Sequence, residues 1–246
     1  MPLPPNDIYR AHVHNLRSVE TGIAHIEREL RDAIARRDSA SGDALLKILL
    51  LLTGGWAECR LKKLMYEPNG FSQQDRDAIT GCRQQIEWWK KALDIGFRAR
   101  YAVPNGALPG ALRPMARLLY NELLSTIDSD LRPIIEMRNT LAHGQWSRPL
   151  NSSGDDIAPD MISALKKENA LSARFKKTIL ESLAAILHDL VAGNAAFERD
   201  FDTHFTHLEN ARRNLKNREY KKWETSMIQK YDTGRTRRNS NLQDAH

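Results

Sequence analysis

The chain has 246 residues, of which 41% are apolar and 28% charged, and its formal net charge is +6. This length and composition suit one large or two small globular domains with a hydrophobic core. The most apolar run, residues 44–57, contains Lys47 and a glycine pair and falls short of the roughly 20 residues that a membrane-spanning helix needs. The N-terminal residues do not resemble a secretory leader, so we expect a soluble, cytoplasmic protein without membrane contact.

Helix is the only element that the sequence predicts. Apolar residues recur at three- to five-residue steps, and no sustained alternation of period two marks a strand. The expected helices cover residues 6–38, 43–66, 73–99, 111–126, 129–143 and 159–231, the last with little interruption. The second is apolar nearly all round at its start, which predicts a central position. We therefore expect an all-α domain over residues 1–231 and a disordered basic tail over 232–246.

Polar residues at the expected helix starts are candidate caps. Asp43 or Ser41 is placed to cap the second helix, and Ser129 to cap the one that ends at residue 143. Ser72 and Asp75 have the spacing of a capping box before the third helix. The segments 101–110 and 144–156 are loops by their composition.

The cysteines do not indicate a metal site. Cys59 and Cys82 form no CxxC pair, which predicts free thiols in a reducing compartment and no zinc. His204 and His207 lie three residues apart, but no third metal ligand is evident near them.

All of the net positive charge falls in residues 211–246, because residues 1–210 are formally neutral. A basic segment on a neutral body favours contact with phosphates. The side chains expected to bind RNA there are Lys221, Lys222, Arg235, Arg237 and Arg238. A solvated helix end, or a surface that docks an acidic partner, explains the same charge.

The stretch RNTLAHGQW, residues 138–146, is the main candidate for chemistry. Its ordinary explanation is the end of a helix, since Gly144 is placed as the glycine that follows the last turn and a histidine is favoured by the helix dipole there. Asn139 and His143 lie one turn apart and share a face. Four neighbouring apolar residues are expected to hold this helix against a core: Ile134, Ile135, Met137 and Leu141.

A second arginine and histidine with the same spacing shows that the spacing alone decides nothing. Arg199 and His204 lie inside a long predicted helix, where positions five apart point about 140° away from each other. The helix end distinguishes residues 138–143 from this second pair.

The residues IIEMRNTLAHG, 134–144, resemble the signature of the HEPN superfamily, all-helical proteins of prokaryotic defence, toxin–antitoxin and RNA-processing systems. The family motif is an arginine, a polar residue and a later histidine, which here are Arg138, Asn139 and His143. The long C-terminal helical stretch is similar to that of abortive-infection members. The resemblance implies a HEPN-type bundle, a metal-independent endoribonuclease without a cofactor, and a homodimer in which two motifs form one composite site.

The residue types suit cleavage of RNA by its own 2′-OH. Histidine exchanges a proton near neutral pH, so His143 is the candidate for proton transfer. Arg138 is permanently charged and planar and can contact phosphoryl oxygens in a bidentate way. Asn139 is expected to orient the histidine or to bind the phosphate or ribose. Many toxin-type members carry a tyrosine two residues after the histidine, but Gln145 stands here, which argues against regulation by modification of that tyrosine.

Several aromatic and charged residues outside the motif have both a structural and a functional explanation. Trp146 follows the motif and is a candidate to stack on an RNA base or to cover the site. Trp88 and Trp89 point about 100° apart on a helix, so one should be core and the other a boundary residue, with base stacking as the alternative. Glu58 and Lys62 are four apart, as in an ion pair on a helix surface, and the alternative is that they position Arg138.

The sequence thus predicts an RNA-cleaving enzyme of phage defence or toxin–antitoxin growth arrest, with an antitoxin or a larger defence complex as a further partner. The alternative is a non-catalytic helical module that binds a partner protein or RNA. The two readings differ in whether the His143 side chains of two copies meet in one basic cleft.

Overall fold

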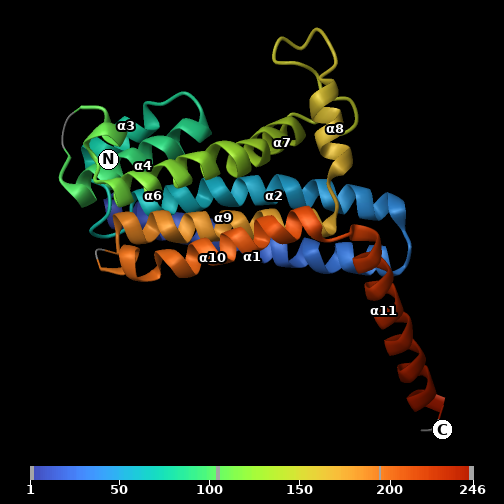
Figure 1. Cartoon of the computed structure of the whole chain (residues 1–246). Helices are drawn as coiled ribbons and strands as arrows, with labels where there is room; N and C mark the ends of the chain where they lie inside the picture. The colour runs from blue at the N-terminus through green and yellow to red at the C-terminus, as the bar shows by residue number, and fades with distance from the viewer. Residues whose placement is uncertain (1–2, 104–105, 194, 244–246) are drawn as a thin grey trace.

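The computed structural model describes residues 3–103, 106–193 and 195–243, with side chains described up to residue 236 (Figure 1). Its elements are α1 (Pro5–Ala35), α2 (Ser39–Met65), α3 (Gln73–Thr80), α4 (Gln85–Tyr101), α5 (Leu108–Ala111), α6 (Pro114–Thr126), the π-helical turn η1 (Ile127–Leu131), α7 (Arg132–Ala142), α8 (Pro159–Lys167), α9 (Ala170–Val191), α10 (Ala196–Asn217) and α11 (Tyr220–Gln243). Among the described residues the sole β-type pairing is an isolated bridge between Leu150 and Ile157. The predicted all-α class is confirmed.

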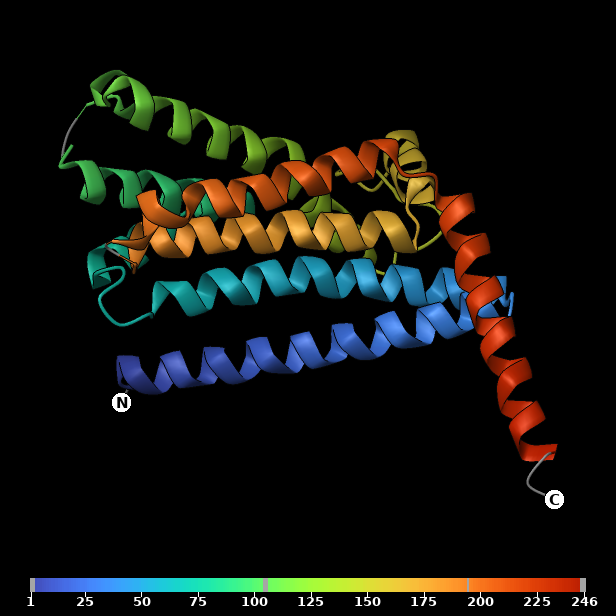
Figure 2. The same cartoon turned by 60° about the horizontal axis from the view of Figure 1, so that its bottom comes forward.

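The long helices α1, α2, α9 and α10 run side by side and form the body of the molecule (Figures 1 and 2). Helix α2 packs against α1, α7 and α9, so its predicted central position is confirmed. The core continues under α4 and α6 through a cluster of aromatic rings: Phe97, Tyr120, Phe197 and Phe201. Within the described residues, no helix combines the length and hydrophobicity that a bilayer crossing requires.

Helix α2 begins four residues earlier than the sequence predicted. The carboxylate of Asp38 accepts hydrogen bonds from the backbone N–H of Ser41, at 3.0 Å, and from its hydroxyl, at 2.6 Å. Asp38 is therefore the cap, and the two residues expected in that role, Ser41 and Asp43, lie inside the helix. The capping box of Ser72 and Asp75 is confirmed at the start of α3.

The single helix expected over residues 73–99 is two helices, α3 and α4. Gly81 ends α3, and the indole N–H of Trp88 donates to the carbonyl of Cys82, at 2.9 Å, which holds the connection between them. This break matters for the site, because it brings residues 83–85 beside α7. Part of the loop expected over 101–110 is also helical, since α5 begins at Leu108.

The chain does not restart a helix at Ser129. Helices α6 and α7 are joined without a break by η1, and Ser129 lies inside that turn and caps nothing. The backbone N–H of Arg132 donates to the carbonyl of Ile127, five residues back. Pro133 has no N–H, and its ring would clash with the carbonyl four residues back in a regular α-helix. The wider π-turn before it relieves that conflict.

The continuous helix expected over 159–231 is divided into α8 to α11. Asn169 caps α9 in a capping box with Ser172, which ends α8. Close packing at Gly193, where an added Cβ would lie 3.0 Å from the Cα of Asp189, accompanies the tight return from α9 to α10. Local capping and a tight turn therefore interrupt a stretch whose hydrophobic pattern is helical throughout.

Helix α11 leaves the body at an angle (Figure 2) and continues to Gln243, where a disordered tail from residue 232 was expected. The segment contains no proline, and the cost of one helical glycine, Gly234, is only about 1 kcal/mol. An ion pair between Arg37 and Asp232, at 3.2 Å, joins α11 to the end of α1.

Candidate active site

Helix α7 carries Arg138 and Asn139 on a support that is fixed to the core. Its four apolar residues, Ile134, Ile135, Met137 and Leu141, are all buried, as predicted. Arg138 is half-buried and Asn139 is exposed. Helix α7 packs mainly against α2. Arg138 lies at the border of this contact, where it reaches a side chain of α2.

Glu58 of α2 holds the guanidinium of Arg138. Its Oε2 accepts from Nη2 of Arg138 at 2.6 Å, and its Oε1 accepts from Nζ of Lys62 at 2.7 Å. The side chains of Arg138 and Glu58 are 29% and 24% exposed, so solvent weakens this pair less than one on the open surface. The predicted ion pair of Glu58 with Lys62 is thus present, and of these two residues Glu58 also contacts Arg138.

Asn139 contacts the arginine and not the histidine. Its Oδ1 accepts from Nη1 of Arg138 at 3.0 Å. The backbone carbonyl of Asn139 accepts from the backbone N–H of His143 at 3.1 Å, as in an ordinary last helical turn. Within one chain the side chain of Asn139 therefore does not orient His143, and the expected role in binding a phosphate or ribose stays a prediction.

Gly54 permits α2 and α7 to approach closely at this point. A Cβ added to Gly54 would lie 2.4 Å from the Cβ of Arg138 and 2.7 Å from its Cγ. A larger residue would push Arg138 away from Glu58. This role of Gly54 was not predicted, although a glycine inside a predicted helix, in TGGW, is a signal of close packing.

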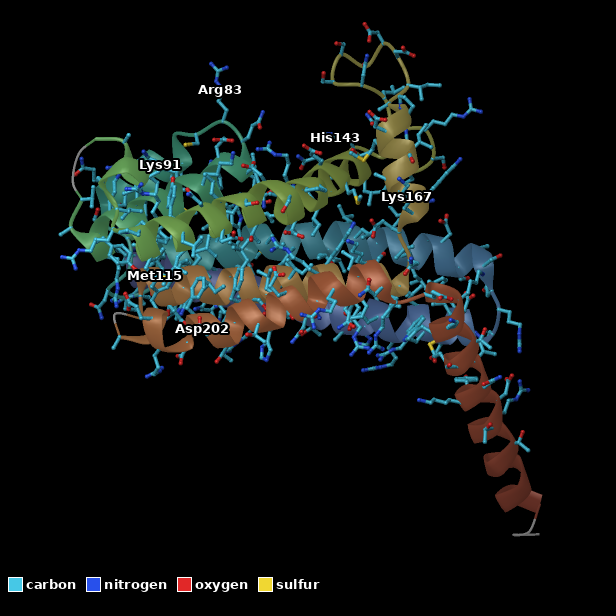
Figure 3. The ribbon with its side chains drawn as sticks, in the orientation of Figure 1. Arg83, Lys91, Met115, His143, Lys167 and Asp202 are labelled. Atoms are coloured by element: carbon cyan, nitrogen blue, oxygen red, sulfur yellow. The ribbon has the colours of Figure 1, made fainter. Side chains whose placement is uncertain are left out.

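His143 lies at the C-terminal tip of α7, beyond the last helical residue (Figure 3). It is exposed, and within the described residues its side chain has no hydrogen bond, ion pair or ring contact. Gly144 follows with φ of 76°, the left-handed conformation expected of a glycine after a helix. One chain therefore does not bring His143 into contact with Arg138.

A pocket of about 500 Å³ opens beside Arg138, between α7 and the start of α4. Its lining joins groups from three helices and the connection before α4: Glu58, Arg83, Gln84, Gln85, Ile86, Trp88, Arg132, Ile135, Glu136, Arg138 and Asn139. In Figure 3, Arg83 stands out from that connection, displaced along α7 from His143. Arg138 and Asn139 thus face a polar hollow, whereas His143 lies outside it.

The thiol of Cys59 lies next to this site but is a poor nucleophile. Burial, and then the charge of Glu58, raise the pKa of Cys59 above its ordinary value. The raised pKa keeps the thiol protonated near neutral pH, and only the thiolate attacks. Cys59 and Cys82 are both free, as expected.

The tryptophans near the motif have different surroundings. Trp89 is buried, with 1% of its surface exposed, and Trp88 is half-buried at the pocket, so the predicted division into core and boundary is confirmed. Trp146 packs against the core, and its indole N–H donates to the carbonyl of Leu141 at 2.9 Å. Trp146 is outside the pocket lining and closes the last turn of α7.

The basic residues expected to bind RNA lie on α11, far along the chain from the motif. Lys221 and Lys222 are exposed and form local ion pairs, Lys221 with Glu224 of α11 at 3.1 Å and Lys222 with Glu219, just before α11, at 3.0 Å. Arg235 is exposed as well. The side chains of Arg237 and Arg238 lie outside the described residues. Of the described side chains in this group, Lys221, Lys222 and Arg235 are all absent from the lining of the pocket beside Arg138.

The second arginine and histidine pair lies in a network of paired charges. Arg199 pairs with the adjacent Asp200, whereas Nε2 of His204 lies 3.2 Å from Oδ2 of Asp189 on α9. Nδ1 of His188 lies 3.3 Å from the other oxygen of Asp189. His204 and Arg199 have separate partners, as expected for positions on different sides of a helix.

No cluster of three or more histidine, cysteine or carboxylate side chains that could hold a metal ion occurs among the described residues. Comparison of the chain with family models, with curated proteins and with solved structures gave no match. The assignment of a function therefore depends on the geometry around Arg138 and on the resemblance of residues 134–144.

Proposed function

We propose that the protein is a metal-independent endoribonuclease that acts through Arg138, Asn139 and His143. The observation that carries the proposal is the fixed guanidinium of Arg138, held by Glu58 and Asn139 at the edge of a pocket, one and a half helical turns before an exposed histidine. A charge fixed in advance stabilises a developing phosphoryl charge without reorganisation cost. This arrangement agrees with the resemblance to the HEPN signature.

The reaction needs only proton transfer and charge stabilisation. His143 takes the proton from a ribose 2′-OH, and the 2′-oxygen attacks the adjacent phosphorus. The bond from phosphorus to the 5′-oxygen breaks, and that oxygen receives a proton from the protonated His143 as it leaves. Arg138 stabilises the charge that gathers on the phosphoryl oxygens. The products are a 2′,3′-cyclic phosphate and a 5′-OH.

In this proposal, a second copy of the chain brings a histidine close to Arg138. Residues five apart on a helix point about 140° apart, and His143 lies outside the pocket that contains Arg138. A homodimer that places the motif ends of two chains face to face would bring the histidine of one to the arginine of the other. The resemblance further supports a setting in phage defence or toxin–antitoxin growth arrest, with activity released by a trigger or by loss of an antitoxin.

The test is cleavage of total RNA in EDTA by wild type, His143→Ala and the control His207→Ala. His207 is an exposed histidine on α10. We expect cleavage by wild type and by the control, loss of cleavage in His143→Ala, and 2′,3′-cyclic phosphate ends on the products. Equal cleavage by all three proteins would overturn the assignment of His143.

The second candidate function is a non-catalytic helical module that binds RNA or a partner protein. The observation that favours it is the separation of His143 from Arg138 within one chain. Absence of cleavage by wild type, together with retained RNA binding and a monomeric mass in solution, would establish this alternative.

A further inference from the structure

The pocket beside Arg138 contains groups that binding of a single phosphate does not require. Of its three arginines, Arg132 pairs with Asp128 at 2.5 Å and Arg138 pairs with Glu58. Arg83 is exposed and has no hydrogen bond or ion pair within the described part of the chain. Arg83 is thus a cation at the rim that is available to a second phosphate.

Trp88 gives the pocket an aromatic wall. The side chain is half-buried and packs against the core, and its indole N–H is fixed by the carbonyl of Cys82. Nζ of Lys62 lies 5.9 Å from the centre of the ring. A ring that is already held in place loses little freedom when a flat ligand stacks on it.

Gln85 adds an amide that lacks a partner. Its Nε2 is buried and makes no hydrogen bond with the described residues. An unpaired buried N–H is costly, so rotation of the Gln85 side chain that brings Nε2 to an acceptor of a ligand in the pocket would be favourable. A primary amide offers a donor and an acceptor side by side, which is the pattern that the edge of a nucleobase complements.

We propose that this pocket binds one nucleobase of an RNA strand, with a flanking phosphate at Arg83 and the scissile phosphate at Arg138. Trp88 and the side chains of Ile86 and Ile135 contact the base, and Gln85 reads its edge. The volume of about 500 Å³ is adequate for a nucleotide, since small-molecule pockets span roughly 300–1,000 Å³. The choice of RNA rests on the proposed function, but base binding itself is independent of cleavage.

The experiment measures binding of the full chain to octamers of 2′-O-methyl RNA by fluorescence anisotropy. These strands lack the 2′-OH and are not cleaved. Four carry a single base type each, and a fifth is an abasic chain with the same phosphates. We expect at least one base-bearing octamer to bind on the order of tenfold more tightly than the abasic chain. Nucleoside monophosphates, added as competitors, distinguish a free nucleotide from a strand.

Three variants assign the parts of the pocket. Gln85→Ala, and Gln85→Glu which keeps the shape of the side chain, should change the ranking of the four bases. Arg83→Ala should weaken all five octamers alike. The matched controls are Gln74→Ala on α3 and Arg113→Ala before α6, both exposed and outside the pocket. Thermal unfolding of each variant separates loss of binding from loss of fold.

Equal binding of base-bearing and abasic octamers by wild type would overturn the proposal, as would a ranking unchanged in both Gln85 variants. Monophosphates that bind as tightly as the octamers would overturn the assignment to a strand. Cleavage of ordinary RNA, measured in parallel, reports on the nuclease separately. A protein that prefers one base and cleaves nothing retains this proposal and loses the nuclease, whereas cleavage without any preference for a base does the reverse.

Discussion

Two stretches of this chain have an arginine five residues before a histidine, and the side chains of the two pairs have different partners in the structure. At 199–204, in the first turns of α10, Arg199 pairs with Asp200 and the half-buried His204 pairs with Asp189 of α9. At 138–143, the arginine is fixed by Glu58, and the histidine stands at a helix end without a side-chain partner in the described residues. Arg199 and His204 of the first stretch each have a carboxylate partner, whereas in the second stretch the arginine is fixed and the histidine is open.

The two stretches show how the same spacing can yield paired side chains in one place and an unpaired histidine in another. A histidine that is hydrogen-bonded to a carboxylate on a neighbouring helix contributes to packing. The ring nitrogen in that hydrogen bond is not available to a substrate. A histidine beyond a helix end contributes little to stability and is available for proton exchange. Substitutions at 138–143 should therefore change RNA cleavage, and substitutions at 199–204 should change the stability of the fold.

The largest expected effect is the loss of RNA cleavage in His143→Ala, by about 10²–10⁴-fold, because general acid–base catalysis supplies a factor of that size. Its free energy of unfolding should stay within about 0.5 kcal/mol of wild type, as for other surface changes. His204→Ala should show the reverse, with cleavage unchanged and stability lowered by about 1 kcal/mol through the lost contact with Asp189. Urea unfolding and cleavage rates measured on both variants check this.

The next effect concerns the contact that fixes the arginine. In Gly54→Ala the new Cβ would lie 2.4 Å from the Cβ of Arg138, so α7 must move, at a cost of about 1–3 kcal/mol. Cleavage should fall as well, because the guanidinium moves with the helix. The control is Gly55→Ala on the same helix, where the added Cβ has nothing within 4 Å. That change should raise stability by about 0.5–1 kcal/mol through helix propensity. Equal stability of the two variants would show that the close contact is not rigid.

Much of the fold was predictable because the hydrophobic pattern is regular, but its interruptions were not. The all-helical class and the capping box at Ser72 follow from local sequence. The π-turn before Pro133 and the cap at Asp38 depend on how neighbouring turns share hydrogen bonds. Residues 159–231 have a continuous helical pattern, and their breaks depend on local caps and turns, such as the capping box at Asn169 and the tight turn at Gly193.

The site was predictable in part for the same reason. The burial of the apolar face of α7 and the glycine after His143 follow from the sequence of one helix. The pairing of Glu58 with Arg138 spans 80 positions and was one of two readings until the helices were placed. The approach at Gly54 and the pocket at Gln85 required the three-dimensional arrangement of α2, α4 and α7.

A smaller effect is expected when the partner of Arg138 loses its charge. Glu58→Gln keeps the size of the side chain but weakens its hold on the guanidinium, so kcat for RNA cleavage should fall by on the order of tenfold. Lys62→Met is the matched control, because it removes the other partner of Glu58 and leaves Arg138 paired. The values of kcat and KM should separate the two variants. A larger loss in Lys62→Met than in Glu58→Gln would place the function of this cluster on the lysine.

The smallest expected effect is a loss of stability at acidic pH. It concerns Glu67, which lies 3.9 Å from Nε2 of His188 and so adjoins the charge network of His188, Asp189 and His204. Burial raises the pKa of Glu67, but hydrogen bonds from Lys63 and Tyr9, with the charge of His188 nearby, outweigh it and hold that pKa below its ordinary value of 4.5. A carboxylate with a lowered pKa stabilises the fold fully above its ordinary pKa and loses that contribution as pH falls through the lowered value. The difference in free energy of unfolding between wild type and Glu67→Gln should therefore shrink as pH falls below the ordinary value of 4.5. The difference between wild type and His143→Ala should stay near zero across the same range, because no carboxylate pairs with His143 among the described residues. A shrinking difference in His143→Ala instead would mean that the open end of α7 is paired in solution, and the contrast between the two stretches would fail.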